Sequence, residues 1–355
     1  MSSHSFVGLG RRILIGLCVV TGLAVAGFGA LLVYGAVQLG KIPRVACVAC
    51  EEPPGDGPVN VLVVGSDSRV SVSDDAEAFG TPDMVGGQRS DTIIVLRVDP
   101  GGDTAAMLSI PRDLWVPLAS GGVNRINAAF EGGPDNLVRT VNGALEIPIH
   151  HYVEVEFAGF RDIVRAVGDV TVFFDAPARD AVTGLQVEQA GCVALDGDDA
   201  LAYVRSRNYE TLVDGRWRGG GAGDLDRISR QQDFMRRVLA KLRSVRNPAT
   251  IHRVVTTGTE NLTLDERLSV ADIEQLALRF RRLDPFGVEM YTVPTVFDHV
   301  VIGRRRASVL RLQQPQAAEA IARFLGRAPV DPPAAPAGRP APGLVTTTTL
   351  PPRPC

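Results

Sequence analysis

Short aliphatic runs alternate with amphipathic segments through the middle of the chain. Most of the runs are nearly continuous in apolar character, as expected of strands covered on both faces, and they occupy residues 59–64, 92–98, 104–110, 151–157, 169–174 and 288–293. Between the runs, apolar residues recur at spacings of three and four, which predicts helices at 134–145, 157–168, 224–244 and 270–283. Asp135 is the expected N-cap of the first helix. The alternation predicts an α/β fold with a mixed central sheet flanked by helical layers.

The segment from Ile13 to Gly40 carries no charged residue. It exceeds the roughly 20 apolar residues with which a helix crosses a bilayer, and it exceeds the roughly 7 to 15 apolar residues of a cleavable signal peptide. We therefore expect one uncleaved transmembrane helix. Arg11 and Arg12 precede it and favour a cytoplasmic N-terminus, although two cations on the other flank weaken this charge asymmetry.

Composition changes along the chain divide it into five parts. The last 28 residues are rich in proline, alanine and threonine, a composition that cannot bury enough apolar surface to become ordered. The expected parts are a cytoplasmic N-terminus at 1–12, a transmembrane helix at 13–40, a linker at 41–57, an extracytoplasmic α/β body at 58–327 and a disordered tail at 328–355.

Bulk composition narrows the possible partners. The chain has 355 residues, of which 45% are hydrophobic, so it can fill a sizeable core. Its net charge of -3 argues against a generally basic nucleic-acid-binding protein. Only two of its 37 cationic residues are lysines, and the planar fork of arginine suits phosphate oxygens.

The five cysteines leave two interpretations open. Cys18 lies in the apolar segment, while Cys47 and Cys50 form a CxxC without the second pair that a zinc site would need. Disulfides are expected in an exported body, but free thiols remain an alternative for Cys47, Cys50, Cys192 and Cys355, and their pairing is open. His150 and His151 open a predicted strand and are interpreted as structural.

Charged residues gather where the predicted elements begin or end. They are Asp67 and Arg69, Arg89 and Asp91, Arg112 and Asp113, Arg205 and Arg207, and the group Asp224, Asp226, Arg227 and Gln231. Any one of these could be a surface ion pair or a turn cap. If the strand ends meet at one rim of the sheet, however, the carboxylates would suit a divalent metal ion and the arginines an anion, a combination that matches a metal-bound pyrophosphate.

Other common catalytic motifs are missing from the sequence. There is no GxxxxGK[ST] phosphate loop, no GxSxG nucleophile elbow and no HExxH zinc motif. A nucleotide-binding P-loop enzyme, a serine hydrolase of the α/β type and a zinc protease of the HExxH type are therefore not favoured.

Six segments resemble, in order, the motifs of the LytR-CpsA-Psr proteins, which are membrane-anchored enzymes of bacterial cell-envelope assembly. The resemblance covers about residues 59–245 and rests on "VLVVGSDSR", "QRSDTIIVLRVDP", "LSIPRDLWV", "NRINAAF", "ALAYVRSR" and "GDLDRISRQQ". The sequence departs from the commoner pattern where Arg125 replaces the lysine of "KINAAY" and Phe130 its tyrosine. The charge is kept, so activity is still expected.

The resemblance implies transfer of a glycopolymer from a polyprenyl pyrophosphate carrier to peptidoglycan, with formation of a phosphodiester. By motif position, it implies that Asp67 and Asp91 hold Mg²⁺, with Mn²⁺ possible in its place. It gives the pyrophosphate-binding set as Arg89, Arg112, Arg205, Arg207, Arg227 and Gln231. It gives Arg112, Asp113 and Asp224 as catalytic residues, with Asn127 in support. Because the acceptor hydroxyl must lose a proton, Asp113 and Asp224 are the candidate bases, and the choice between them stays open. The helices at 157–167 and after Asp224 are expected to surround the polyprenyl tail, or else to be core helices only.

Two other functions compete with this hypothesis. Water could replace the sugar hydroxyl, which would make the chain a polyprenyl-pyrophosphate hydrolase, or the body could be a non-enzymatic envelope-linked regulator. DNA binding is disfavoured because no basic recognition helix is present. The arginine- and alanine-rich composition and the lack of a further C-terminal domain indicate an actinobacterial source, where arabinogalactan is one option, but the glycopolymer stays open between arabinogalactan, teichoic acid, capsule and others.

Overall fold

The computed structural model describes the body and only isolated positions near the two ends. The described residues are 37, 40–55, 57–66, 90–99, 104–219, 224–269, 271–273, 275–276, 283–302, 305–327 and 355. The predicted N-terminal segment 1–12, nearly all of the predicted span 13–40 and all of the predicted tail but Cys355 lie outside them. Among the helices that the structure does describe, none has the length and apolar character to cross a bilayer.

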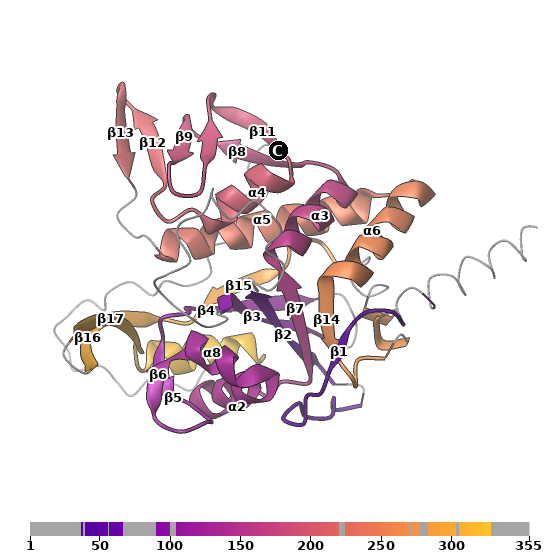
Figure 1. The fold of residues 1–355 in the computed structure, drawn as a ribbon, viewed down its shortest axis with the longest axis vertical. Coiled ribbons are helices and arrows are strands. Elements are labelled where there is room, and N and C mark those ends of the chain that lie inside the picture. Colours follow the sequence, from indigo (N-terminus) through magenta and orange to yellow (C-terminus); the bar gives the residue numbers. More distant parts are fainter. Residues whose placement is uncertain are drawn as a thin grey trace, which may run out of the picture.

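A mixed sheet forms the centre of the molecule (Figure 1). Within the described residues it has seven strands in the order β1-β14-β7-β2-β3-β4-β15. In chain order these strands are β1 (Arg44–Val45), β2 (Val59–Ser66), β3 (Ser90–Val98), β4 (Ala105–Ile110), β7 (His151–Glu156), β14 (Leu262–Asp265) and β15 (Glu289–Thr292). The pairs β1–β14, β7–β2 and β4–β15 are parallel and the others antiparallel, so the predicted mixed sheet is confirmed.

Helices cover both faces of this sheet. On one side lie the 3-10 helix η4 (Ile126–Gly132), α2 (Gly133–Leu145) and α8 (Gln316–Phe324), and on the other lie α3 (Phe157–Val167), α5 (Asp224–Ser244) and α6 (Pro248–Asn261) (Figure 1). Two hairpins flank the first side: β5 (Trp115–Pro117) with β6 (Val123–Arg125), and β16 (Thr295–Ile302) with β17 (Arg305–Leu312).

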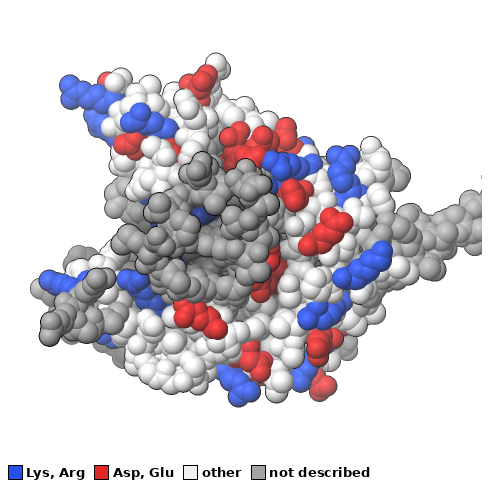
Figure 2. All heavy atoms as spheres, in the orientation of Figure 1, with Lys and Arg blue, Asp and Glu red and all other residues white. Residues whose placement is uncertain are grey.

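A smaller part packs beyond α3 and α5. It contains α4 (Gly197–Arg205), the pair β8 (Val170–Phe174) and β11 (Gly191–Leu195), and a sheet of β10 (Leu185–Val187), β9 (Ala178–Asp180), β12 (Glu210–Val213) and β13 (Arg216–Gly219). Asp196 caps α4, since its side chain accepts from the backbone N–H groups of Asp198 and Asp199. Figure 2 shows acidic side chains gathered over α4, and basic and acidic side chains interspersed along the right-hand side.

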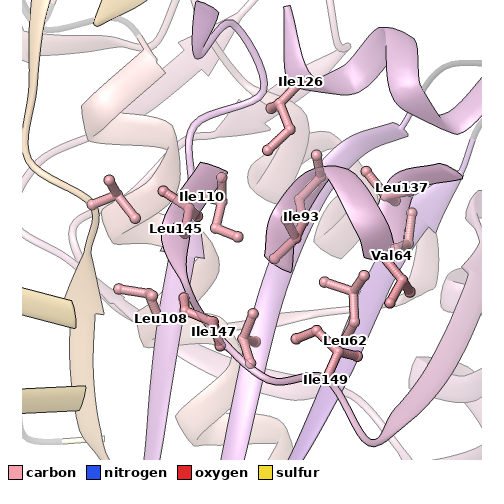
Figure 3. Close-up of a cluster of buried hydrophobic side chains, with 14 of the residues drawn as sticks. Leu62, Val64, Ile93, Leu108, Ile110, Ile126, Leu137, Leu145, Ile147 and Ile149 are labelled. Atoms are coloured by element: carbon pink, nitrogen blue, oxygen red, sulfur yellow. The ribbon is translucent and has the colours of Figure 1, made fainter. Parts of the chain in front are cut away.

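The main core lies between the central sheet and α2 (Figure 3). Alternate residues of the strands point to this face, among them Leu62 and Val64 of β2 and Ile93 of β3. They meet Leu137 and Leu145 of α2, and all five side chains are at most 3% exposed. The opposite face of β3 and β4 packs on α5 instead. Because both faces are covered, these strands read as continuous apolar runs in the sequence.

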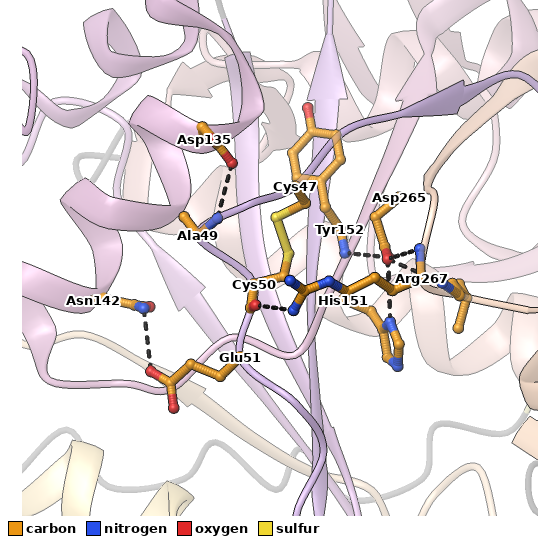
Figure 4. Close-up of a disulfide and its surroundings, with 11 residues drawn as sticks. Cys47, Ala49, Cys50, Glu51, Asp135, Asn142, His151, Tyr152, Asp265 and Arg267 are labelled. Atoms are coloured by element: carbon orange, nitrogen blue, oxygen red, sulfur yellow. Dashed lines mark hydrogen bonds and ion pairs between the residues drawn. A yellow bond between two sulfur atoms is a disulfide. The ribbon is translucent and has the colours of Figure 1, made fainter.

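The start of the body differs from the predicted linker at 41–57. Ile42 is buried, β1 pairs with β14, and a disulfide joins Cys47 to Cys50, both of which belong to the main core (Figure 4). Asp135 is not the N-cap of α2, which is Gly132; its carboxylate accepts from the N–H of Ala49 at 3.0 Å. The segment 42–50 is thus part of the folded body, because its apolar and sulfur side chains are needed to complete the core.

A second disulfide joins Cys192 of β11 to Cys355, so the four cysteines whose pairing was open form two bonds. The predicted helix at 270–283 lies largely outside the described residues. Of the predicted strands, 169–174 pairs with β11 rather than joining the central sheet.

His150 has a structural role, as its sequence position indicates. It is 4% exposed, and its Nδ1 accepts a hydrogen bond of 2.8 Å from the N–H of Asn60, so this nitrogen carries no proton. Burial, together with the neighbouring charges of His151 and Arg97, lowers the pKa of His150 to about 4.

This buried imidazole predicts a loss of stability in mild acid. An unfolded histidine takes up a proton near pH 6.5, while the folded one resists it down to about pH 4, so stability is lost as the pH falls through this window. We expect the free energy of unfolding to drop by about 2 kcal/mol between pH 6.5 and 5. In His150→Gln this drop should disappear, whereas His252→Gln, on the exposed face of α6, should keep it. Denaturant titrations at the two pH values measure the free energy of unfolding. The same drop in His150→Gln as in the parent chain would contradict the role given to His150.

Candidate functional site

Strand ends carrying predicted site residues meet at one edge of the central sheet. Ser66, at the end of β2, pairs with Ser90, at the start of β3, and with Glu156, at the end of β7. The end of β4 lies at the same edge, because Ile110 pairs with Ile93. Asp91 is the second residue of β3 and Arg112 follows β4 by two residues. The antiparallel register thus brings together elements that are separated along the chain.

Arg112 and Asp113 lie in a tight turn after β4. The turn begins at Pro111, whose carbonyl accepts from the N–H of Leu114 at 3.0 Å. The proline ring fixes the φ angle of this first residue. The carbonyl of Arg112 accepts from the N–H of Asn127 at 3.2 Å, and Asn127 is 6% exposed. The backbone of Asn127 therefore holds the turn, and its predicted role in the site stays a prediction.

The carboxylate of Asp113 lies between two guanidinium groups. Its Oδ1 is 3.3 Å from Nε of Arg125, and its Oδ2 is 3.8 Å from Nε of Arg112. Arg125 also donates from Nη2 to the carbonyl of Ser308 on β17, at 2.8 Å, and the N–H of Leu310 donates to the carbonyl of Asp113 at 3.0 Å. The arginine that replaces the usual lysine thus joins the turn to the β16–β17 hairpin. Phe130 is buried in the main core.

The first turns of α5 connect this edge to α4. Gln231 donates from Nε2 to Oγ1 of Thr92 at 3.2 Å and to the carbonyl of Val204 at 3.1 Å. Thr92 follows Asp91 in β3, and Val204 precedes Arg205 at the end of α4. A single amide therefore fixes the two predicted site segments relative to one another.

Arg205 stacks on an aromatic ring at the neighbouring strand. Its Cζ lies 4.6 Å from the centroid of the Phe157 ring, which begins α3 directly after β7. A Cβ added at Gly65 of β2 would lie 3.9 Å from that ring and 3.2 Å from Cβ of Thr92. Arg205 thus lies on the β7–β2 side of the edge and Arg112 on the β4 side.

Asp180 holds the segment that carries Arg207, a role not foreseen from the sequence. The carboxylate is 1% exposed and accepts from Oγ of Ser206 at 2.7 Å and from the N–H groups of Arg207 and Asn208 at 3.0 and 2.9 Å. Burial alone would raise its pKa, but these bonds, with those from the backbone after Asp180, lower it. Arg230 adds a bond to the carbonyl of Ser206 and stacks on Tyr209.

Loss of this carboxylate should loosen the segment after α4. In Asp180→Ala, the three donors at 206–208 lose their buried acceptor, which costs about 1–3 kcal/mol. We expect amide hydrogen exchange at Arg207 and Asn208 to become about tenfold faster, since 1.4 kcal/mol corresponds to a factor of ten. Mass spectrometry of the peptide around residues 204–210 measures it. Asp196→Ala, which removes the cap at the other end of α4, should speed exchange at 198–199 and leave 207–208 unchanged; equal exchange at 207–208 in both variants would contradict the role of Asp180.

The remaining predicted residues are placed by position only or lie in the interior. Asp67 and Arg89 lie outside the described residues, each directly next in sequence to a residue at the sheet edge. Asp91 and Asp224 occupy the start of β3 and the start of α5. Arg227 of α5 is buried, at 4% exposure.

The described residues cover the predicted metal site only in part, since Asp67 lies outside them. Among the described residues no cluster of three or more His, Cys, Asp or Glu could hold a metal ion. The hydroxyl of Ser66 is completely buried and has no hydrogen-bond partner among the described residues. It lies at the end of β2, beside the strand that carries Asp91. A hard cation with oxygen ligands, such as Mg²⁺, fits these groups.

Comparison with known proteins gives consistent matches over the body. The model of the LytR_cpsA_psr family matches residues 42–323. The probable cell wall biosynthesis protein LcpB of Corynebacterium glutamicum is 35% identical over 285 residues, covering 78% of this chain and 64% of that protein. The polyisoprenyl-teichoic acid–peptidoglycan teichoic acid transferase TagV of Bacillus subtilis is 37% identical over 199 residues, covering 54% of this chain and 47% of that protein. This chain therefore spans between about half and two thirds of the length of these two relatives.

Solved structures share the fold. The LytR-Csp2A-Psr enzyme from Actinomyces oris superposes with a TM-score of 0.64 at 26% identity, and the match covers 80% of this chain and 95% of the other. The mixed α/β architecture around the central sheet is therefore common to both chains.

Proposed function

The chain belongs to the LytR-CpsA-Psr family, and from this membership we propose that it is a phosphotransferase that moves a glycopolymer from a polyprenyl pyrophosphate carrier to peptidoglycan. The name of its relative TagV includes a polyisoprenyl-linked donor and a peptidoglycan acceptor. One observation carries the proposal: Arg112 and Asp113 lie at the same sheet edge as the end of α4 that bears Arg205. Gln231 of α5 holds that end of α4 to β3.

The proposed reaction exchanges one phosphorus–oxygen bond for another. The hydroxyl oxygen of the acceptor sugar attacks the phosphorus that bears the glycopolymer, the bond to the lipid phosphate breaks, and polyprenyl phosphate leaves with the electron pair. Such transfers need little covalent help from the protein, so positioning and neutralisation of charge lower the barrier. Arg112 and Arg205, on the two sides of the edge, would bind the pyrophosphate from opposite ends. Arg89, Arg207 and Arg227 would complete the set.

A carboxylate would take up the proton of the acceptor hydroxyl. Asp113 and Asp224 are the two candidates. The carboxylate of Asp113 lies between Arg112 and Arg125. It is therefore close to the cations that would bind the donor. Asp67 and Asp91 would hold Mg²⁺ or Mn²⁺, which would supply further positive charge at the pyrophosphate.

The lipid part of the donor needs an apolar surface. α3 and α5 cover the sheet face opposite the main core, and between them the Phe160 and Phe234 rings, with centroids 5.7 Å apart, belong to a second buried cluster, in which Phe234 is 1% exposed. We propose that the polyprenyl tail lies along these helices. The span at 13–40 would anchor the chain in the cell membrane with its body extracytoplasmic.

An assay with and without acceptor tests the proposal. The purified full chain in detergent would receive a defined polyprenyl-pyrophosphate glycan, with or without peptidoglycan fragments. The transferase predicts a phosphodiester-linked product and polyprenyl phosphate only when acceptor is present. Release of the lipid phosphate without acceptor, at the same rate, would identify a hydrolase instead, and no turnover of any donor would leave the regulator as the better account.

A further inference from the structure

An apolar groove lies away from the candidate site, between the end of α5 and the beginning of α6. It has a volume of about 350 Å³ and is lined mainly by Leu242, Val245, Ile251 and Val254, with Arg243 and Arg246 among the lining residues. Leu242 and Ile251 are 36% and 48% exposed, which is high for large apolar side chains. No aromatic side chain lines the groove.

Positive charge is concentrated around this groove. The 26 residues between Asp233 and Glu260 contain no acidic residue and six cations, in a chain whose net charge is -3. Arg236 and Arg237 of this stretch are buried, so they add little to the charge of the surface. Arg243 and Arg246 are exposed and donate to the backbone carbonyls of Leu283 and Arg243, so these bonds leave their charges without a carboxylate counterpart.

The groove lies at the start of α6, and the other end of this helix leads to the strands next to the predicted membrane span. α6 passes directly into β14, and β14 pairs with β1. Ile42, which precedes β1, packs with Leu264 and Leu268, and the predicted span ends at Gly40, two residues earlier. α6 has 14 residues, so its first turn is about 21 Å from β14. Figure 1 shows α6 and β1 on the same side of the molecule.

We propose that this groove and its arginines form a docking surface for an anionic phospholipid bilayer. Apolar side chains such as Ile251 and Leu242 would enter the layer between the headgroups, and Arg243, Arg246 and Arg253 would meet the lipid phosphates. A second copy of the chain would bring like charges together, which disfavours self-association. A glycan partner would need stacking rings and hydrogen-bonding side chains, which this lining lacks. The surface would hold the body in a fixed orientation to the membrane, a role separate from the transfer reaction.

Fluorescence of a tryptophan placed in the groove tests the proposal. The full chain carrying Ile251→Trp would be reconstituted into vesicles that contain brominated lipid, with or without phosphatidylglycerol. We expect blue-shifted, quenched emission from Trp at this position in the anionic vesicles, relative to the parent chain. Replacing Arg243, Arg246 and Arg253 with glutamine should lower the ratio of docked to undocked body by roughly a hundredfold, since each arginine near such a surface contributes about 1 kcal/mol. The quenching should then be lost.

A matched position gives the control. Val182, in the turn between β9 and β10, is 70% exposed, and its tryptophan variant should show no quenching. Equal quenching at 251 and 182 would overturn the proposal, as would quenching at 251 that is unchanged in neutral vesicles or in the glutamine variant. A blue shift that rises with protein concentration in the absence of lipid would show that a second copy covers the groove, and would overturn it as well.

Discussion

Replacing Arg205 with alanine is expected to lower the transfer rate by roughly a hundred- to a thousandfold while leaving the fold intact. Removing one preorganised charged donor from the site of developing charge has an effect of about this size in other enzymes. Arg205 is half-buried, belongs to the last turn of α4 and stacks on Phe157. Its guanidinium is therefore preorganised at the sheet edge, and little reorganisation is needed when the donor binds.

Two further variants separate charge from geometry. Arg205→Lys keeps the positive charge but loses the planar fork, so it should restore only part of the rate. Arg179 is the matched control: it stacks on Trp217 at 4.2 Å and pairs with Glu210 on the smaller sheet, away from the edge. Arg179→Ala should keep its rate within about twofold, which is the scale of a surface substitution. Initial rates with defined donor and acceptor measure these effects, and full turnover in Arg205→Ala would remove that residue from the site.

Replacing Asp265 with alanine is expected to lower the free energy of unfolding by about 3–5 kcal/mol. The carboxylate is completely buried at the end of β14 (Figure 4). It accepts from the N–H groups of Tyr152, Arg267 and Leu268 at 2.9–3.0 Å, and its Oδ2 lies 3.2 Å from Nδ1 of His151. Alanine would leave these donors buried without an acceptor.

The pH dependence of this effect has a definite sign. Burial acts to raise the pKa of Asp265, but the bonds from His151 and the backbone outweigh it and lower the pKa. The stabilisation that the Asp265 carboxylate provides is therefore complete above the ordinary aspartate pKa of about 3.9, and it is lost as the pH falls below that pKa. Urea unfolding at pH 7 measures the difference. Exposed Asp169→Ala is the control and should stay within about 0.5 kcal/mol of the parent; a similarly small change in Asp265→Ala would contradict the prediction.

The central sheet could be predicted because burial on both faces leaves a clear mark in the sequence. β4 is buried at every residue, and its six residues lie inside the predicted run at 104–110. Convergence at one edge was also predictable, since Asp91 and Arg112 lie next to the apolar runs that end there. What the sequence could not give is which strands neighbour each other, because pairing depends on contacts between distant segments.

Three features escaped prediction for identifiable reasons. β1 has two residues and no apolar pattern, so its pairing with β14 is set by tertiary contacts alone. The β16–β17 hairpin mixes charged and apolar residues and includes a run of arginines, which obscures its alternation. Asp180 ends a three-residue strand, β9. Its bonds to Val182 and Thr183 form a local turn that a sequence could suggest, but its bonds to residues 206–208 could not be predicted.

The bond between Cys192 and Cys355 turns the second half of the chain into a covalent ring. Cys355 is thereby attached to β11, a strand near the middle of the sequence. A single cut by a protease anywhere from 193 to 354 would open the ring without releasing a fragment. Such a nicked molecule would keep its full mass until the sulfur bridge was reduced.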